Sequence, residues 1–159
     1  MASQRPITSA SASLPSIYSF TLTTLEPLFA INGVFLALFK PQSYLSTMTR
    51  DTATVAPDTR FLYTQLAGAW LFFAFVEAVV LRRFDDLRLW RLLCAAMLLS
   101  DAAYCHSVAQ AVGGWRAWMV LGEWTAADHA VFWSTAPCAL IRLLVVLDVG
   151  VREHRAKGE

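Results

Sequence analysis

The chain has 159 residues, of which 57% are hydrophobic and only 16% are charged, against a charged share of about 25% in ordinary soluble domains. A net charge of +1 gives no electrostatic case for nucleic-acid binding. The sequence has no metal-ligand spacing and no phosphate-binding glycine loop, so we expect no metal and no cofactor. The apolar residues form four blocks, which indicates membrane spans, and the odd number of cysteines inside them excludes a disulfide framework.

The chain begins with a serine- and alanine-rich segment over residues 1–15, which we predict to be a flexible tail. The first apolar block follows at about 16–39 and ends before Pro41, a residue that interrupts helices. A signal peptide would be shorter than this block and would not carry Glu26 and Asn32. We therefore expect a retained membrane span.

Three more apolar blocks follow, at about 61–81, 89–112 and 127–149, before a polar tail over 151–159. Each holds about the twenty residues needed to cross a hydrocarbon core of roughly 30 Å. Helices are the expected form, because every backbone polar group must be satisfied within the span. The sequence thus predicts an all-α membrane protein, a bundle of four transmembrane helices whose domain covers residues 16–150.

Basic residues are distributed unequally between the two ends of this bundle. An even number of spans places both termini on one side, which carries eight basic residues, whereas the other side carries four. The positive-inside rule therefore favours cytosolic termini.

The loop before the fourth span contains Trp115, Trp118 and Trp124. Tryptophan favours the headgroup zone, so this loop is expected to lie along the membrane interface. The alternative is a lid over the mouth of a cavity. In that case Glu123, Asp128 and His129 would face the cavity.

Each predicted span carries an ionisable side chain away from its ends: Glu26, Glu77, Asp101 and Arg142. A charge at mid-bilayer costs about 3 kcal/mol, so these side chains should meet in a polar interior cavity and not face lipid. A rise of about 1.5 Å per residue places Glu26, Asp101 and Arg142 near mid-membrane. The same count places Glu77 one or two turns closer to the termini.

Other polar side chains extend this predicted track toward the end without the termini. Asn32 and His106 lie at that end, and Tyr104 shares a helical face with Asp101 because it follows three residues later. His106 follows five residues later and is rotated by about 140°, so it need not join that face. Two purely structural interpretations stay open: Arg142 as an ion pair that holds helices together, and His106 as a core histidine.

A buried set of acids beside an arginine suits acid–base chemistry. A carboxylic acid in an apolar site can keep its proton and act as a general acid, while a carboxylate beside an arginine acts as a base. The site would be reached from lipid, so the expected substrate is a hydrophobic small molecule. No serine or cysteine has a base at the right spacing, which favours a mechanism without a covalent nucleophile.

Four short motifs carry a resemblance to a known family: Glu26-Pro27, KPxxYxxxMT over Lys40–Thr49, Glu77 followed by Leu81-Arg82, and DLRxWR over Asp86–Arg91. Over about residues 25–150 the chain resembles a family of small four-span membrane proteins of filamentous fungi. Some members occur in gene clusters for reduced polyketides and resemble the membrane epoxide hydrolases of aurovertin- and citreoviridin-type pathways. Asp101 matches an acidic position that many members follow with a histidine three residues later, where this chain has Tyr104.

The resemblance implies an epoxide hydrolase or epoxide-opening cyclase that acts on a lipophilic polyketide in fungal secondary metabolism, in the endoplasmic reticulum membrane. The expected catalytic residues are Asp101, Glu77 and Glu26, and the residues expected to bind or orient the substrate are Arg142, Asn32, Tyr104 and His106. One alternative is an isomerase or cyclase of a terpenoid or sterol. Another is a non-catalytic lipid-binding or scaffold protein whose buried charges only hold the helices together.

Overall fold

The computed structural model describes residues 8–152, and within that range it contains helices and no strand. Four helical spans are long and apolar enough to cross a membrane: Ser16–Phe39, Pro57–Arg83, Leu87–Ala111 and Ala126–Val146. Their ends differ from the predicted ones by four residues or fewer. The prediction of an all-α bundle of four transmembrane helices is confirmed, and the chain is an integral membrane protein.

The spans are divided into helical elements as follows. The first contains α2 (Ser16–Phe20), η1 (Thr21–Leu25) and α3 (Glu26–Phe39). The second contains η2 (Pro57–Thr59), α5 (Arg60–Phe75), η3 (Val76–Val80) and α6 (Leu81–Arg83). The third is α7 (Leu87–Ala111) and the fourth is α9 (Ala126–Val146). The shorter helices are α1 (Ala10–Ser13), α4 (Pro41–Thr49), α8 (Trp115–Trp118) and η4 (Leu121–Glu123).

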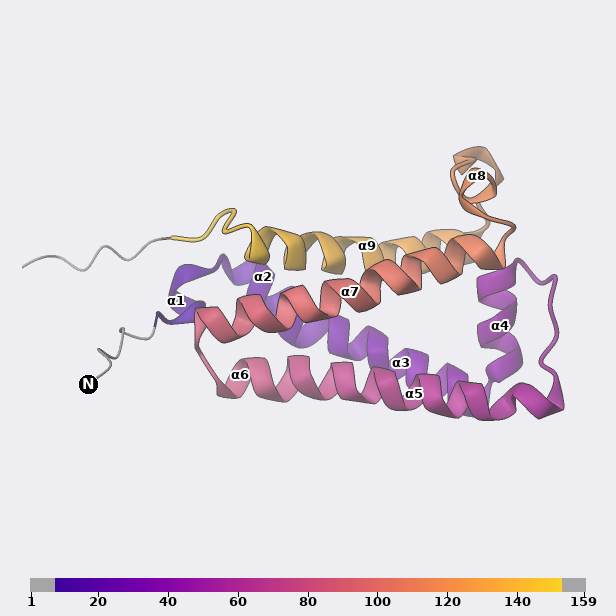
Figure 1. The fold of residues 1–159 in the computed structure, drawn as a ribbon, viewed down its shortest axis with the longest axis horizontal. Coiled ribbons are helices and arrows are strands. Elements are labelled where there is room, and N and C mark those ends of the chain that lie inside the picture. The colour runs from indigo at the N-terminus through magenta and orange to yellow at the C-terminus, as the bar shows by residue number, and fades with distance from the viewer. Residues whose placement is uncertain (1–7, 153–159) are drawn as a thin grey trace, which may run out of the picture.

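The long helices form two packed pairs. α3 packs along α5, α7 packs along α9, and α3 also contacts α9. Figure 1 shows these helices along the length of the molecule, with α7 inclined to α5, and it shows α4 lying across one end. The described ends of the chain lie at the opposite end, beside α1 and α6. The two pairs and α4 therefore enclose the interior of the bundle from different sides.

The outer faces of the spans are apolar. Large side chains such as Leu28, Phe72, Leu99 and Leu140 point outward from α3, α5, α7 and α9, and each is more than half exposed. The fully buried side chains include Arg142 and Glu77. This distribution is the reverse of a water-soluble bundle, and it is the one expected where lipid surrounds the helices.

Two turns of π-helix interrupt the first and second spans. η1 ends directly before Glu26, and η3 contains Glu77. Pro27 explains the first, because its nitrogen carries no hydrogen and cannot donate to the carbonyl of Thr23. That carbonyl accepts a hydrogen bond from Nη2 of Arg82 at 2.6 Å instead. Such π turns are frequent at functional sites, and both of these turns position an acid.

The start of the described chain is part of the core, which corrects the prediction of a flexible tail for residues 8–15. Ala10 and Leu14 are buried against a cluster that includes Leu81 and Trp90. Small side chains allow this close packing, and serine hydroxyls hold the segment to the loop between α6 and α7 through Asp85. Residues 1–7, and residues 153–159 of the predicted C-terminal tail, lie outside the described range.

Candidate functional site

One arginine joins acids from three other spans. Arg142 on α9 donates from Nη1 to Asp101 on α7 at 2.5 Å. Its Nη2 donates to Glu26, the first residue of α3, at 2.5 Å and to Glu77 in η3 at 2.6 Å. We call these four side chains the Arg142 cluster. The structure therefore brings together the predicted catalytic acids and the predicted arginine, as the cost of a charge in lipid requires.

The Arg142 cluster is buried but not fully satisfied. Glu77 is 0% exposed and Arg142 is 2% exposed, while the side chains of Glu26 and Asp101 are 14% and 16% exposed. Oε2 of Glu26, Oε2 of Glu77 and Nε of Arg142 are buried and have no hydrogen-bond partner within residues 8–152. An unpaired buried polar group costs about 1–3 kcal/mol. The Arg142 cluster therefore keeps unpaired hydrogen-bonding groups at a cost in free energy.

The charges of the Arg142 cluster do not balance if every carboxyl is ionised. Three carboxylates and one guanidinium would carry a net charge of −2 inside an apolar bundle, an expensive state. Glu26 and Glu77 accept from the same nitrogen of Arg142, so their carboxyls are neighbours. A proton held by this pair removes part of the excess charge. The cluster is thus suited to holding a proton and to exchanging it.

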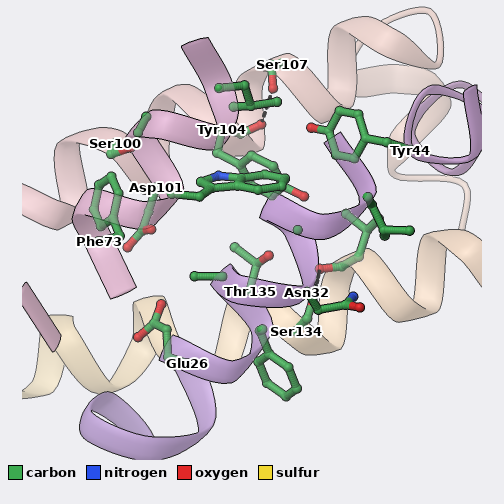
Figure 2. A pocket seen from close by; sticks show the side chains of 18 of the residues that line it. Glu26, Asn32, Tyr44, Phe73, Ser100, Asp101, Tyr104, Ser107, Ser134 and Thr135 are labelled. Atoms are coloured by element: carbon green, nitrogen blue, oxygen red, sulfur yellow. Dashed lines mark hydrogen bonds between the residues drawn. The ribbon is translucent and has the colours of Figure 1, made fainter. Parts of the chain in front are cut away.

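A cavity of about 750 Å³ extends from the Arg142 cluster toward α4. Figure 2 shows Glu26 and Asp101 at one end of this cavity and Tyr44 at the other, with Tyr104 between them. The walls between the two ends are largely apolar and aromatic. A volume of this size holds a small organic molecule, and the polar groups gathered at one end could fix its orientation.

Three of the four residues expected to bind or orient the substrate line this cavity: Arg142, Tyr104 and Asn32. Tyr104 lies in its wall, where its hydroxyl is 3.7 Å from Sδ of Met48. Asn32 lines it from α3, across from α7. The structure also places Ser134 and Thr135 of α9 in the wall.

His106 does not line the cavity, so the structure does not bring it together with the other predicted site residues. Its side chain is exposed, and its Nδ1 accepts a hydrogen bond from Nε1 of Trp115 at 3.2 Å. The rotation of about 140° from Asp101 turns it away from the bundle interior.

Glu77 joins the Arg142 cluster through its side chain, because its Oε1 accepts from Nη2 of Arg142 at 2.6 Å. Its predicted depth, one or two turns closer to the termini, stays a prediction, because two long side chains can bridge such an offset along the helix axes.

The part of the site that the sequence did not predict is α4. Tyr44, Thr47 and Met48 of this helix line the end of the cavity, and the loop containing the tryptophans does not. Two features of the sequence point to this helix. Pro41 is suited to a helix start, and the lining residues are spaced by three and four positions, as on one face of a short helix.

A second ion pair holds α4 in place. Nε of Arg50, directly after α4, donates to Oδ2 of Asp128 at 3.0 Å, and Asp128 is 2% exposed. The same carboxylate closes the capping box of α9 by accepting from the backbone nitrogen of Thr125 at 2.7 Å. If the tryptophan loop formed a lid, Asp128 would face the cavity beneath it. It instead fastens α4 to the start of α9.

A close contact between α3 and α5 shapes one wall of the cavity. A Cβ atom at Gly33 would lie 2.1 Å from Cζ3 of Trp70, so only glycine fits beside this indole. Trp70 and Phe73 line the cavity on the helical face that leads to Glu77. Phe73 and Trp70 precede Glu77 by four and seven residues, so the three side chains share one face of the helix.

The centre between Glu26, Glu77 and Asp101 is filled by the guanidinium of Arg142. No group of three or more histidine, cysteine, aspartate or glutamate side chains within the described residues is arranged to hold a metal ion.

A family model described as a domain of unknown function, DUF7704, matches residues 11–152. No curated protein and no solved structure matches the chain. The match covers all four spans and the helices that close the cavity.

Proposed function

We propose that this chain, which belongs to the DUF7704 family, is a membrane enzyme that opens an epoxide on a lipophilic small molecule by carboxyl acid–base catalysis. One observation carries the proposal. Three carboxyls from three spans meet on a single buried arginine at the polar end of a cavity of about 750 Å³, and two of their oxygens have no partner within residues 8–152. Acids that only hold helices together would not need an adjoining cavity.

Opening an epoxide needs one group that gives a proton and one that takes a proton. The Glu26–Glu77 pair shares one arginine nitrogen and supplies the acid, which protonates the ring oxygen as the carbon–oxygen bond breaks. Asp101 has Nη1 of Arg142 to itself, stays ionised, and accepts the proton of the attacking water. The proton then returns to the glutamate pair. The net reaction adds one water to the epoxide, or forms a ring when a hydroxyl of the substrate attacks.

The other residues of the site position the reacting groups. Arg142 fixes the three carboxyls within reach of one another, while Tyr104 and Asn32 can hold the water or an oxygen of the substrate. Holding the reactants in a fixed geometry is a large part of catalysis. The aromatic residues toward α4 would bind the apolar remainder of the substrate.

The biological setting belongs to the same proposal. The resemblance to fungal proteins of polyketide clusters supports a polyketide substrate and a role in secondary metabolism. The eight-to-four distribution of basic residues supports cytosolic termini, and a lipophilic substrate supports the endoplasmic reticulum membrane.

The reaction type is tested with purified protein in lipid nanodiscs, a long-chain epoxide such as methyl 9,10-epoxystearate, and water labelled with heavy oxygen. We expect a diol that gains one labelled oxygen. An isomerase or cyclase of a terpenoid or sterol would give a product without label, and a scaffold protein would leave the epoxide unchanged. Either of these results, in well-folded protein and repeated with several lipophilic epoxides that carry no hydroxyl, would contradict the proposal.

A further inference from the structure

Cavity-lining residues on α5 and α7 are exposed, which indicates that the cavity opens sideways between these two helices. They are Ala69 on α5 and Ser100 and Ala103 on α7. α5 and α7 make few contacts with each other, whereas each packs closely against its partner in a helix pair. The border of this opening therefore consists of short side chains, at a height where the surrounding surface of the spans is apolar.

The two ends of the cavity along the helix axes are covered. At one end α4 lies across the bundle, and the ion pair between Arg50 and Asp128 holds it there. At the other end the buried side chains of Leu22, Leu81 and Trp90 pack together beyond the Arg142 cluster. Access along the axis from either aqueous side would require this packing to open.

The opposite side of the cavity, between α3 and α9, has a different border. Asn32 and Ala130 are exposed there, but Phe29 also lines the cavity on that side, and α3 and α9 are in contact. A phenylalanine ring narrows this second side. The side between α5 and α7 has only short side chains among its exposed lining residues.

We propose that the substrate reaches the Arg142 cluster sideways from the bilayer, through the opening between α5 and α7, and that Ala69, Ser100 and Ala103 determine which molecules pass. The inference rests on the proposed function for the reacting group, an epoxide. The route itself is a property of the cavity. It selects uncharged, elongated molecules that are already dissolved in lipid and are narrow enough to pass between two helices.

The shape of the cavity sets how such a molecule lies. Its lining residues on the second span run from Leu66 in α5 to Glu77 in η3, which is about 16 Å along the helix axis at about 1.5 Å per residue. A chain lying along this wall places its reactive group at the Arg142 cluster and its apolar part beside Trp70 and Tyr44. The epoxide carbon of the substrate then lies at the polar end of the cavity, and the apolar chain of the substrate extends from it toward α4. No charged group of the substrate needs to enter the cavity.

The test is photolabelling, which does not depend on turnover. A methyl ester of a diazirine fatty acid is dissolved in the lipid of the nanodiscs, the sample is illuminated, and labelled residues are located by mass spectrometry. We expect label on Tyr44 and Thr135, which lie on different walls of the cavity. Ala103→Trp should lower this labelling by about tenfold or more, because it blocks the opening as a closed lid would.

Ala102→Trp is the matched control. Ala102 is exposed on the same helix at the same depth but does not line the cavity, so this variant should be labelled like the wild type. Ala69→Trp blocks the opening from its other border and serves where Ala103→Trp does not fold, as judged by size-exclusion and thermal melting. Equal cavity labelling in folded Ala103→Trp or Ala69→Trp protein and in the control would overturn the route. Loss of labelling in Ala130→Trp alone would overturn it in favour of the other side.

The two proposals fail separately. If wild-type protein hydrolyses no epoxide but its cavity labelling is lost in Ala103→Trp, the route stands and the proposed reaction does not. If wild-type protein adds labelled water to an epoxide and Ala103→Trp turns over at the wild-type rate, the reaction stands and the route is wrong.

Discussion

Replacing Gly33 by alanine tests whether the close approach of α3 and α5 shapes the cavity. The new methyl group would lie 2.1 Å from Cζ3 and 2.3 Å from Cε3 of Trp70, far inside van der Waals contact. Overpacking of this kind costs about 1–3 kcal/mol. Against this, exchanging a glycine for alanine inside a helix gains about 0.5–1 kcal/mol. Gly33→Ala should therefore be less stable than a matched glycine replacement that meets no neighbour.

Gly68→Ala supplies that matched control. Gly68 lies inside α5, and a Cβ atom there meets nothing within 4 Å. The gain in helix propensity is common to both variants, so the difference between them isolates the contact with Trp70. A difference of about 1–3 kcal/mol corresponds to roughly 2–12 °C in melting temperature for a chain of this size. Thermal melting in detergent measures it.

A double variant decides whether Trp70 is the cause. Trp70→Leu removes the ring that the new methyl group would meet, so Gly33→Ala should cost much less in that background. Because Trp70 lines the cavity, Gly33→Ala should also alter photolabelling of Tyr44, while Gly68→Ala should not. The reasoning would be refuted if Gly33→Ala were as stable as Gly68→Ala, or if its cost were unchanged beside Trp70→Leu.

Two more predictions concern the ends of the bundle. Arg50→Gln leaves the buried carboxylate of Asp128 without its guanidinium partner. It should lower the free energy of unfolding by about 1–3 kcal/mol and speed hydrogen exchange in α4. Replacing the exposed Arg60 by glutamine should do neither. Burial alone would raise the pKa of Asp85, but hydrogen bonds from Ser9 and Ser11 lower it below its ordinary value of 3.8. Asp85 should thus stabilise the N-terminal segment fully above about pH 4, and this stabilisation should be lost as the pH falls below that value. Asp85→Asn should therefore speed hydrogen exchange of residues 9–14 at pH 7 but not in acid.

The spans could be predicted because lipid imposes a strong and simple constraint. Blocks of about twenty apolar residues leave few alternatives to helices. The same constraint predicted that Glu26, Asp101 and Arg142 would meet, since each would be costly in lipid. It could not show that Glu77 and Glu26 would share one nitrogen of Arg142, because residue counts contain neither the packing of the helices nor the reach of the side chains.

Outside the spans the sequence was less informative, because neither lipid nor a periodic pattern constrains short segments. α1 docks through Ala10 and Ser13, whose small size allows burial but whose composition also suits a flexible tail. α4 covers the cavity with nine residues of mixed polarity, too few to show a clear hydrophobic period. The tryptophan loop carried the strongest compositional signal for a lid, yet it does not line the cavity.

The central claim is that the Arg142 cluster performs acid–base catalysis, and Asp101→Asn tests it most directly. Asparagine keeps the shape of the side chain and can still hydrogen-bond, but it cannot accept a proton from water. We predict that turnover of a lipophilic epoxide per folded molecule falls by about 10²-fold or more, while Glu123→Gln, at an exposed acid outside the cavity, keeps wild-type turnover. Wild-type turnover in well-folded Asp101→Asn protein would contradict the assignment of Asp101 as the catalytic base.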